Sequence, residues 1–428
     1  MAHSLSPEAA DRPGRIVLLL IGLAAALGLA GVARLASPSI THKDVGSLTR
    51  AGGRRLPLTQ EPTISRGKES RQGARGGSQH QGAREPAGDA FPLTAIVPAF
   101  NEAETVADTI SSLQGQTLPP VEIFVVDDCS TDDTGAVAEA AGVRVVRPPA
   151  NTGSKAGAQT FALQFVTTEF VMALDSDTTL APDAVERLSR VFANPEIAAA
   201  SGSVLPRRVS TVWERGRYVE YMFAFSFFKR IQDHYGKPLI SSGCFSLYRT
   251  NVVREVGGWS DRTTAEDMDL TWTLYQRGWK VRFVPQAVCY PIEPCNLDLL
   301  RKQLRRWSHG FVQNVKLHWR GVLGLGYLRS MVALAFWDSA IASVAYLFAI
   351  PLLAAFVSPL FWLAYVVDGP VLLLPVVVDA RKRHEIRRAF ASFPAYFPLR
   401  VANAVMMLKA VVFELVLRRP LLVYEKGH

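Results

Sequence analysis

Short apolar runs alternate with helix-type segments from residue 91 onward, and this alternation constrains the fold more than any other feature of the chain. The apolar runs predict strands at Leu93–Val97, which Pro98 closes, and at Ile123–Val126, Val143–Val146 and Phe170–Leu174. Helices are predicted between them over 102–113, over 155–166, and from the capping residues 130–132 to residue 141. Strands that alternate with helices at this interval predict an α/β fold of the doubly wound type, with a parallel sheet covered on both faces.

Polar and acidic side chains follow the predicted strands at the point where each strand ends. Ligand-binding residues of doubly wound sheets gather at the carboxyl ends of the strands. The side chains that this rule brings to one edge are Asn101, Glu102, Asp127, Asp128, Asp175 and Asp177. This gathering of carboxylates exceeds what solvation requires, so it predicts a binding site at that edge.

Asp175 and Asp177 stand one residue apart directly after the predicted strand 170–174. In extended backbone, residues two apart project to the same side, so both carboxylates aim at one point. Hard cations such as Mg²⁺ or Mn²⁺ take oxygen ligands and share them with substrate phosphates. The alternative is a turn in which Asp or Ser caps backbone groups, and for an isolated Asp-x-Asp pair this alternative is favoured.

Apolar stretches on either side of this region predict a membrane protein. Ile16–Ala33 carries no charge and is long enough to cross a bilayer as a helix. Arginine and lysine are far more numerous after this segment than before it, which favours an uncleaved anchor over a signal peptide and a cytoplasmic region after it. Val332–Phe356 and Pro359–Val378 predict two further spans, whereas Phe393–Leu417 contains charges that permit either a last crossing or an interfacial helix.

The formal net charge of +9 raises the question of a nucleic-acid partner. The positive surplus lies largely beside the predicted membrane segments, including residues 381–388, where anionic lipid is the nearer partner. No nucleic-acid-binding motif accompanies the charge, so no nucleic-acid partner is expected. The four cysteines lack zinc-ligand spacing and fit a reduced cytosolic domain.

A series of short motifs resembles, in order, the inverting family-two glycosyltransferases. The nucleotide-sugar half is matched by P-A-F-N-E at 98–102, V-V-D-D-C-S-T-D-D-T at 125–134, N-T-G-S-K-A-G-A at 151–158 and L-D-S-D at 174–177. The acceptor half is matched by S-G-C-F-S-L-Y-R at 242–249, G-G-W at 257–259, A-E-D-M-D-L at 265–270 and Q-L-R-R-W at 303–307. With the apolar segments, this order resembles the processive membrane synthases of chitin, chitin oligosaccharides, hyaluronan, cellulose and poly-N-acetylglucosamine.

The resemblance implies a GT-A-type nucleotide-sugar-binding domain on a helical transmembrane part. The residues implied to bind the uracil and ribose are Ala99, Asn101, Glu102 and one of Asp127 and Asp128, with Asp127 slightly favoured. Lys155 follows a glycine turn near a helix start and would bind the diphosphate, although a solvated lysine is the alternative. Asp177, with Asp175 beside it, would hold Mg²⁺ or Mn²⁺ on the diphosphate.

The resemblance also implies a general base in the Glu266-Asp267 pair. Asp267 would deprotonate the acceptor hydroxyl as that oxygen attacks the anomeric carbon and inverts it. Glu266 and Asp269 are the nearby competitors for this role. The alternative is that Glu266 and Asp267 only stabilise the start of a helix, where acidic side chains are favoured.

The Q-L-R-R-W motif and Cys244 are implied to serve the acceptor. Arg306 would pair with the diphosphate, and Trp307 would stack beneath the terminal acceptor sugar, with Gln303 opening the motif. An interfacial helix among lipid headgroups is the alternative for this basic and aromatic stretch. Cys244 lies where the family builds its acceptor pocket, and a packed small residue suits it better than a reacting thiol.

Together these implications predict an inverting hexosyltransferase of the plasma membrane, multi-pass, with its catalytic domain in the cytoplasm. The expected substrates are a UDP-sugar, with N-acetylglucosamine favoured, and the end of a growing β-linked polysaccharide that is exported; membrane lipid and an accessory membrane subunit are further candidate partners. The alternatives are a non-processive transferase with a glycolipid acceptor and, remotely, an inactive nucleotide-binding scaffold.

The segments of the chain differ in composition and predict its organisation. Residues 34–90 are rich in Gly, Ser, Gln and Arg with few large apolar side chains, which predicts disorder. The predicted parts are a tail over 1–15, a transmembrane anchor over 16–33, a disordered basic linker over 34–90, the GT-A domain over 91–290, interfacial helices with Q-x-x-R-W over 291–328, and a membrane region of two or three helices over 329–428.

Overall fold

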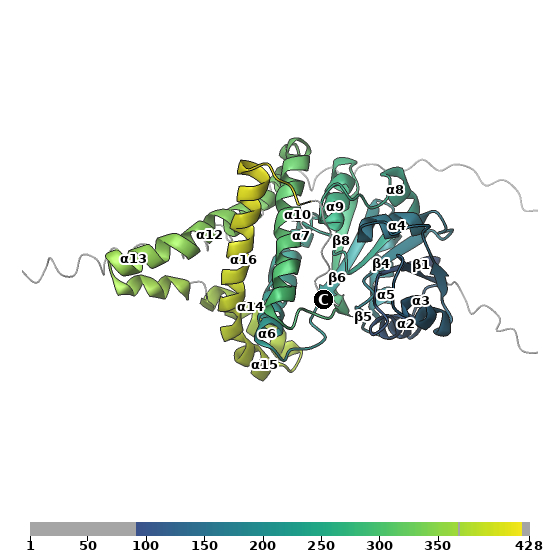
Figure 1. Ribbon diagram of the computed structural model, residues 1–428, viewed down its shortest axis with the longest axis horizontal. Helices are drawn as coiled ribbons and strands as arrows, with labels where there is room; N and C mark the ends of the chain where they lie inside the picture. Colours follow the sequence, from purple (N-terminus) through teal and green to yellow (C-terminus); the bar gives the residue numbers. More distant parts are fainter. Residues whose placement is uncertain (1–90, 367–368, 422–428) are drawn as a thin grey trace, which may run out of the picture. The chain divides into compact units, whose positions relative to one another are not determined.

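The structure, a computed structural model, describes residues 91–366 and 369–421. The tail, anchor and linker predicted over 1–15, 16–33 and 34–90 lie outside these residues. A mixed eight-stranded sheet in the order β3-β2-β1-β4-β7-β6-β8-β5 organises the first part of the described chain (Figure 1). Its strands are β1 Leu93–Ala99, β2 Glu122–Asp127, β3 Arg144–Val146, β4 Phe170–Leu174, β5 Thr179–Leu180, β6 Ile197–Val204, β7 Phe245–Arg249 and β8 Lys280–Tyr290.

The first four strands are parallel, as the alternating pattern predicts. The prediction that Pro98 closes the first strand is wrong, because β1 continues to Ala99 and pairs Pro98 with Val126 of β2. Pairing of β1 with β4 ends at Ile96, so β1 has its β2 neighbour alone where the proline lies, and a strand with one free edge tolerates a residue without an N–H donor. The carboxyl ends of β1, β2 and β4 therefore share one edge.

The second half of the sheet departs from the predicted parallel arrangement. Strand β7 is antiparallel to both β4 and β6, whereas β8 is parallel to β6 and antiparallel to β5. The chain reaches β7 after a long helical excursion and not by the short crossover that the first strands use, so nothing in the strand pattern fixes its direction. This reversal brings the residues before β7 beside the end of β4.

Helices cover both faces of the sheet (Figure 1). Alternate side chains of the strands are buried beneath them in two layers. One face is covered by α2 Val106–Gln114, α3 Thr134–Ala140 and α5 Ala184–Ser189, and the other by α4 Lys155–Leu163, α8 Thr250–Glu255 and α9 Glu266–Gln276. Leu93, Ala95 and Val97 of β1 pack into the first layer, while Ile96 packs into the second. The two-residue period of a doubly covered strand explains why β1 has apolar side chains on both faces, with Thr94 as its polar residue.

Longer helices pack beside the sheet. Helix α10, Leu297–Leu323, contacts both α9 and α16, Tyr396–Val411. Helix α6, Val212–Phe223, contacts α14, Gly369–Lys382, and α16. The remaining helices in this part are α7 Lys229–His234, α11 Gly326–Phe336, α12 Ala342–Val344, α13 Ile350–Phe356 and α15 Ile386–Ser392. The predicted acceptor motif, on α10, is thereby joined to both the sheet layer and the C-terminal helices.

One helical stretch in the described residues is long and apolar enough to cross a membrane. It runs from Gly326 to Phe356 over 31 residues, includes an 18-residue window with a mean hydropathy of 2.0, and contains the predicted span Val332–Phe356. The second predicted span, Pro359–Val378, is not a single helix, because a 3-10 segment ends at Tyr365 and α14 begins separately at Gly369. Val376 of α14 is fully buried against α6, which gives this apolar run a packing role within the protein.

Candidate active site

Lys155 connects the end of β4 with the start of α9. It is the first residue of α4, after Ser154, whose hydroxyl accepts the N–H of Gly157 at 3.0 Å. The Lys155 ammonium forms an ion pair with Asp175 and lies 3.6 Å from Oε1 of Glu266. The side chain is only 10% exposed, so it is not the solvated lysine of the alternative interpretation.

Asp267, the predicted base, lies beside this lysine. Its Oδ2 atom accepts the N–H of Gly243 at 2.6 Å, and its Oδ1 atom accepts the N–H of Met268 at 2.8 Å. Burial and the neighbouring Glu266 charge raise the pKa of Asp267 to about 6, although the Lys155 ammonium opposes this shift. A carboxylate with this pKa is ionised at neutral pH and is a stronger proton acceptor than an ordinary aspartate.

The Asp-x-Asp pair after β4 offers oxygen ligands only. Asp175 is paired with Lys155, and Asp177 is 5% exposed, with its Oδ1 atom accepting the Thr178 hydroxyl at 3.0 Å. Within the described residues, no cluster of three or more His, Cys, Asp or Glu side chains could hold a metal ion. This donor set fits a hard divalent cation that one or two carboxylates hold and that takes its remaining ligands from substrate phosphates.

Asn101 and Glu102 join the end of β1 to the loop after β2. Asn101 has a left-handed backbone conformation, with φ of 55°, and its Oδ1 atom accepts the N–H of Thr131 at 2.8 Å. The N–H of Glu102 donates to the Thr134 hydroxyl at 2.7 Å, and Oε2 of Glu102 accepts the Thr105 hydroxyl at 2.6 Å. Ser130 and Asp132 also accept backbone N–H groups of the loop after β1, and Oδ1 of Asp132 accepts the N–H of Thr134, the first residue of α3, at 3.0 Å. Asp132 thus supplies the capping group predicted for this helix.

Asp127, the last residue of β2, and Asp128, which follows it, contact different loops. Asp127 accepts from Nε of Arg147 at 3.2 Å and from the N–H of Ser130 at 3.0 Å. Asp128 accepts from the N–H of Thr152 at 2.8 Å and from its hydroxyl at 2.9 Å. Both aspartates are buried, so each one orders the loop that it contacts.

Ala99 and Cys244 are packed residues at two of the strand ends. The carbonyl oxygen of Ala99 accepts the N–H of Asp128 at 2.9 Å, and that of Cys244 accepts the N–H of Asp175 at 3.3 Å. The Cys244 sulfur lies 3.9 Å from that of Cys289, and both are free thiols. These backbone hydrogen bonds hold Asp128 next to β1 and Asp175 next to the residues before β7.

The Q-L-R-R-W motif lies on α10, close to the loop that leads into α9. The carbonyl oxygen of Arg306 accepts the Thr264 hydroxyl at 3.0 Å, which places the motif beside the Glu266-Asp267 helix start. Trp307 is 37% exposed, whereas Gln303 points to Arg217 of α6 and accepts from its Nη2 atom at 2.6 Å. The structure therefore brings the motif to the same region as the predicted base.

Four buried polar residues near the site have no signal in the sequence motifs: Arg217, Tyr221, Lys229 and Glu293. Lys229 donates to the Ser242 hydroxyl at 2.9 Å, and burial lowers its pKa to about 8. Glu293 accepts the Tyr221 hydroxyl at 2.9 Å, and burial raises its pKa to about 7. The T-V-W-E capping box at 211–214 predicts the start of α6, but no local pattern reveals that Arg217 on that helix is buried.

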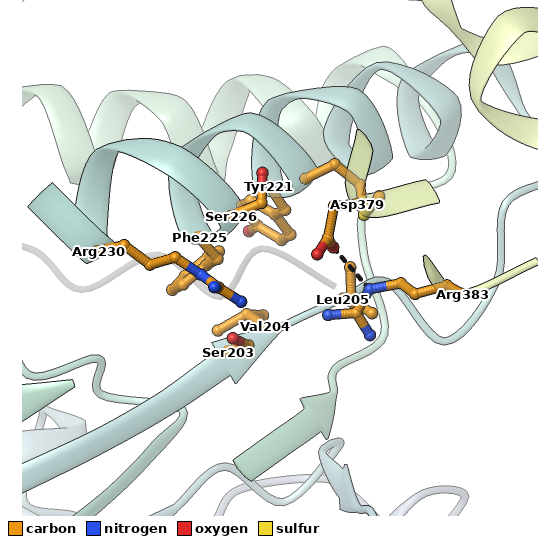
Figure 2. Close-up of a pocket in the computed structure, with 10 residues that line it drawn as sticks. Ser203, Val204, Leu205, Tyr221, Phe225, Ser226, Arg230, Asp379 and Arg383 are labelled. Carbon is orange, nitrogen blue, oxygen red and sulfur yellow. Dashed lines mark hydrogen bonds and ion pairs between the residues drawn. The ribbon is translucent and has the colours of Figure 1, made fainter. Parts of the chain in front are cut away.

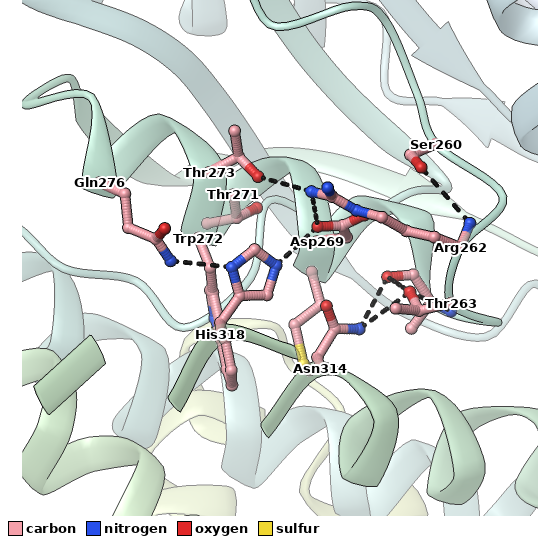
Figure 3. Close-up of polar contacts among 12 residues, drawn as sticks. Ser260, Arg262, Thr263, Asp269, Thr271, Trp272, Thr273, Gln276, Asn314 and His318 are labelled. Atoms are coloured by element: carbon pink, nitrogen blue, oxygen red, sulfur yellow. Dashed lines mark hydrogen bonds and ion pairs between the residues drawn. The ribbon is translucent and has the colours of Figure 1, made fainter. Parts of the chain in front are cut away.

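A polar network beneath α9 fixes this helix to α10 (Figure 3). Oδ1 of Asp269 lies 2.6 Å from Nε2 of His318, and Arg262 donates twice to the same carboxylate, each at 2.7 Å. Nδ1 of His318 lies 2.8 Å from Nε2 of Gln276. Burial opposes ionisation of Asp269, but the contacts with His318 and Arg262 hold its pKa below the ordinary value, which leaves this competitor poorly suited to accept a proton.

A separate small pocket lies where the end of β6 meets α6 and α14 (Figure 2). Its lining includes Ser203, Arg230, Asp379 and Arg383, and Arg383 donates to Asp379 at 2.7 Å. None of the sequence-predicted site residues lines this pocket. The pocket is therefore separate from the strand-end carboxylates that form the candidate active site.

Comparison with known proteins supports the motif resemblance. Residues 94–257 match the family described as glycosyl transferase family 2. Over 223 residues the chain is 29% identical to the poly-beta-1,6-N-acetyl-D-glucosamine synthase of Staphylococcus epidermidis, and over 223 residues it is 30% identical to that of Staphylococcus aureus. Each match covers 51% of this chain and 54% of the relative, so the chain spans about half the length of these curated relatives.

A solved structure has the same fold. A mannosyltransferase from Pyrobaculum calidifontis, solved in complex with GDP-Man and Mn²⁺, matches with a TM-score of 0.50 and 18% identity. The match covers 76% of this chain and 87% of the mannosyltransferase, which supports the predicted GT-A-like α/β architecture. The chain thus carries a family-two glycosyltransferase domain and resembles the poly-N-acetylglucosamine synthases.

Proposed function

We propose that this protein is a membrane hexosyltransferase that transfers N-acetylglucosamine from UDP-N-acetylglucosamine, with inversion, to the end of a growing β-linked polysaccharide. The observation that carries the proposal is the contact of Lys155 with both Asp175 and Glu266, which joins the Asp-x-Asp strand end to the helix start that holds Asp267. The names of the staphylococcal relatives support N-acetylglucosamine as the donor sugar.

In this proposal Asp267 removes the proton from the acceptor hydroxyl. The acceptor oxygen attacks the anomeric carbon, the bond from that carbon to the diphosphate oxygen breaks, and UDP leaves with the electron pair. Attack opposite the leaving group inverts the anomeric centre. The raised pKa of Asp267 suits this proton transfer, and the hydrogen bond from Gly243 orients its carboxylate.

The donor diphosphate is bound by Lys155 and the residues at the strand ends. Asp177, with Asp175, would hold a divalent cation, Mg²⁺ or Mn²⁺, and Mn²⁺ is present in the similar mannosyltransferase structure. When bound, such a cation neutralises charge on the departing diphosphate. Ala99, Asn101, Glu102, Asp127 and Asp128 would form the uridine side of this site.

The acceptor would be bound by Gln303, Arg306 and Trp307, beside Cys244. Trp307 is partly exposed on α10, as an aromatic ring that stacks on a sugar must be. Membrane attachment is supported by the apolar stretch Gly326–Phe356, whose exposed side chains include Trp337, Phe348 and Phe356. The proposal includes a multi-pass topology with the catalytic domain in the cytoplasm and export of the product. It also includes contact of residues 381–388 with anionic lipid and an accessory membrane subunit as a partner.

A non-processive transferase with a glycolipid acceptor is the second candidate. It needs attachment to the membrane but no path for the product through the protein, and the apolar stretch Gly326–Phe356 is sufficient for that attachment. Both candidates use the same carboxylates and the same donor. They differ in the size of the product.

Purified full-length protein in proteoliposomes with a panel of radiolabelled UDP-sugars tests the proposal. We expect incorporation from UDP-N-acetylglucosamine into high polymer, dependent on Mg²⁺ or Mn²⁺ and inhibited by a chelator. A single-sugar glycolipid would instead support the second candidate. UDP binding without turnover for every sugar in the panel would contradict both.

A further inference from the structure

Arg217 of α6 contacts two residues of the Q-L-R-R-W motif at once. Its Nη2 atom donates to Oε1 of Gln303 at 2.6 Å, and its guanidinium carbon lies 4.6 Å from the centroid of the Trp307 ring. The Arg217 side chain is 1% exposed, while Trp307 is 37% exposed. A buried cation thus lies against an aromatic ring whose remaining surface faces outward.

Two carboxylates hold the Arg217 guanidinium in place. Glu220, one helical turn further along α6, accepts from Nη1 of Arg217 and is itself bound by Nδ2 of Asn403 from α16 at 2.8 Å. Oε2 of Glu293 lies 3.7 Å from Nε of Arg217, and it accepts from Nε2 of Gln303 at 3.4 Å. Burial opposes the charge, but these carboxylates raise the pKa of Arg217 above its ordinary value.

The network gives the motif a fixed orientation that α10 alone does not supply. Gln303 and Trp307 are four residues apart, so they lie on one face of the helix. A planar guanidinium can donate to an amide oxygen and stack on an indole ring at the same time, whereas a lysine ammonium cannot satisfy both geometries. The ring of Trp307 would otherwise have rotamer freedom on an exposed helix face.

We infer that Arg217 is a positioning residue for the acceptor: it locks the Gln303 amide and the Trp307 ring so that the terminal sugar is presented to Asp267. The inference rests on the proposed function, which gives Trp307 its role as the acceptor platform. Arg217 itself does not contact the reacting atoms in this account. Its loss therefore affects the acceptor and leaves the donor site unchanged.

A purely structural role for this buried ion pair makes a different prediction. Loss of a buried charge contact would then lower stability and change the apparent affinities for donor and acceptor alike. Arg249 provides a matched control, because it has an ion pair to Glu169 at 3.0 Å, a hydrogen bond to the carbonyl oxygen of Ile197 at 3.0 Å and a ring contact with Phe170 at 5.3 Å. It has the same kinds of contact and ends the 242–249 stretch, but it pairs with Phe170 at the start of β4, the end of that strand opposite to Asp175 and the candidate site.

The experiment measures UDP release by full-length protein in proteoliposomes at varied concentrations of N-acetylglucosamine oligosaccharide and of UDP-N-acetylglucosamine. For Arg217→Lys we expect the acceptor KM to rise about 10-fold to 100-fold, with the donor KM within about twofold of wild type. Arg249→Lys should change neither KM. Because Arg217 and Trp307 would act together, Trp307→Phe should add little to the effect of Arg217→Lys in a double-mutant cycle.

Glu220→Gln serves as a milder variant should Arg217→Lys fail to fold. Its carboxylate is 27% exposed, and its neutralisation weakens the hold on Arg217 without leaving the guanidinium unpaired. We expect a smaller rise in the acceptor KM. An unchanged acceptor KM in folded Arg217→Lys or Glu220→Gln protein, or equal changes for donor and acceptor, would overturn the inference.

Failure of the proposed function can be distinguished from failure of this inference. Wild-type protein that releases no UDP with any oligosaccharide contradicts the proposed function. Equilibrium binding of a fluorescent N-acetylglucosamine oligosaccharide, without donor, then decides the role of Arg217. Weaker binding by Arg217→Lys than by wild type and Arg249→Lys supports positioning, whereas equal binding by all three overturns it.

Discussion

The backbone N–H of Gly243 donates to Oδ2 of Asp267 at 2.6 Å, so the glycine before β7 fixes the orientation of the proposed base. A methyl group on Gly243 would lie 2.9 Å from that oxygen and 3.1 Å from Nζ of Lys155. We therefore expect Gly243→Ala to displace the carboxylate and to lower kcat about 100-fold, with little change in UDP affinity. Steady-state kinetics and UDP titration check this.

Gly326→Ala is the matched control for that substitution, because no heavy atom lies within 4 Å of the added methyl group. It should leave kcat unchanged. Wild-type kcat in Gly243→Ala protein would show that the orientation of Asp267 does not limit the reaction.

The acidic limb of the pH–rate profile should report the ionisation of Asp267. The base must be deprotonated, so kcat/KM should be fully developed above the raised pKa of about 6 and should fall as pH decreases through it. Because the Glu266 charge contributes to the raised pKa, Glu266→Gln should move the limb to lower pH. Initial rates between pH 4.5 and 8 measure the acidic limb of wild type and that of Glu266→Gln.

Glu255→Gln is the control for the pH shift, since Glu255 is 54% exposed and pairs with Arg277. Its acidic limb should coincide with that of wild type. A Glu266→Gln limb that stays in place or moves upward would contradict the assignment of the limb to Asp267.

Removal of Asp177 should uncouple UDP binding from divalent cations. In wild type, Mn²⁺ should tighten UDP binding, because the cation joins the diphosphate to the strand-end carboxylates. Asp177→Ala should abolish this gain while binding of UDP in the presence of a chelator stays similar. UDP titrations with Mn²⁺ and with chelator make the comparison; a variant that retains the full Mn²⁺ effect would exclude Asp177 as the principal ligand.

The contact between His318 and Asp269 should stabilise the packing of α9 on α10 (Figure 3). His318→Ala leaves the buried Asp269 carboxylate with Arg262 alone, and we expect a loss of about 1–3 kcal/mol in unfolding free energy. Thermal unfolding in detergent, monitored by fluorescence, should show a lower Tm. His234→Ala, at an exposed position of α7, should change the Tm little, and an equal Tm for both variants would argue against this role.

The parallel half of the sheet could be predicted from the sequence because its information is local. Each strand there is a short apolar run followed by a helix, and β4 has the predicted bounds Phe170–Leu174. The order of β7, β6 and β8 depends on contacts between segments far apart in the chain. The strand pattern carries no signal for the antiparallel pairing of β7 with β4.

The candidate site shows the same division. Asp175, Asp177 and Asp267 could be selected because they belong to motifs with regular spacing. Arg217 and Glu293 could not, because their importance arises from burial between α6, α10 and the chain after β8. The second predicted span, Pro359–Val378, stays a prediction: it consists of two helical elements, and Val376 packs against α6 while Trp362 and Leu374 are exposed. Apolar composition alone does not separate packing within the protein from contact with a bilayer.

The proposed role of Asp267 as the base can be measured through transfer of radiolabelled N-acetylglucosamine by Asp267→Asn protein. The full-length variant, wild type and an Asp261→Asn control, which changes an exposed acid in the preceding loop, would be reconstituted in proteoliposomes and assayed for labelled glycan and for UDP binding. We expect transfer by wild type and the control, and a loss of about 10²–10⁴-fold in Asp267→Asn with unchanged UDP affinity. Near-normal transfer by Asp267→Asn would exclude Asp267 as the base.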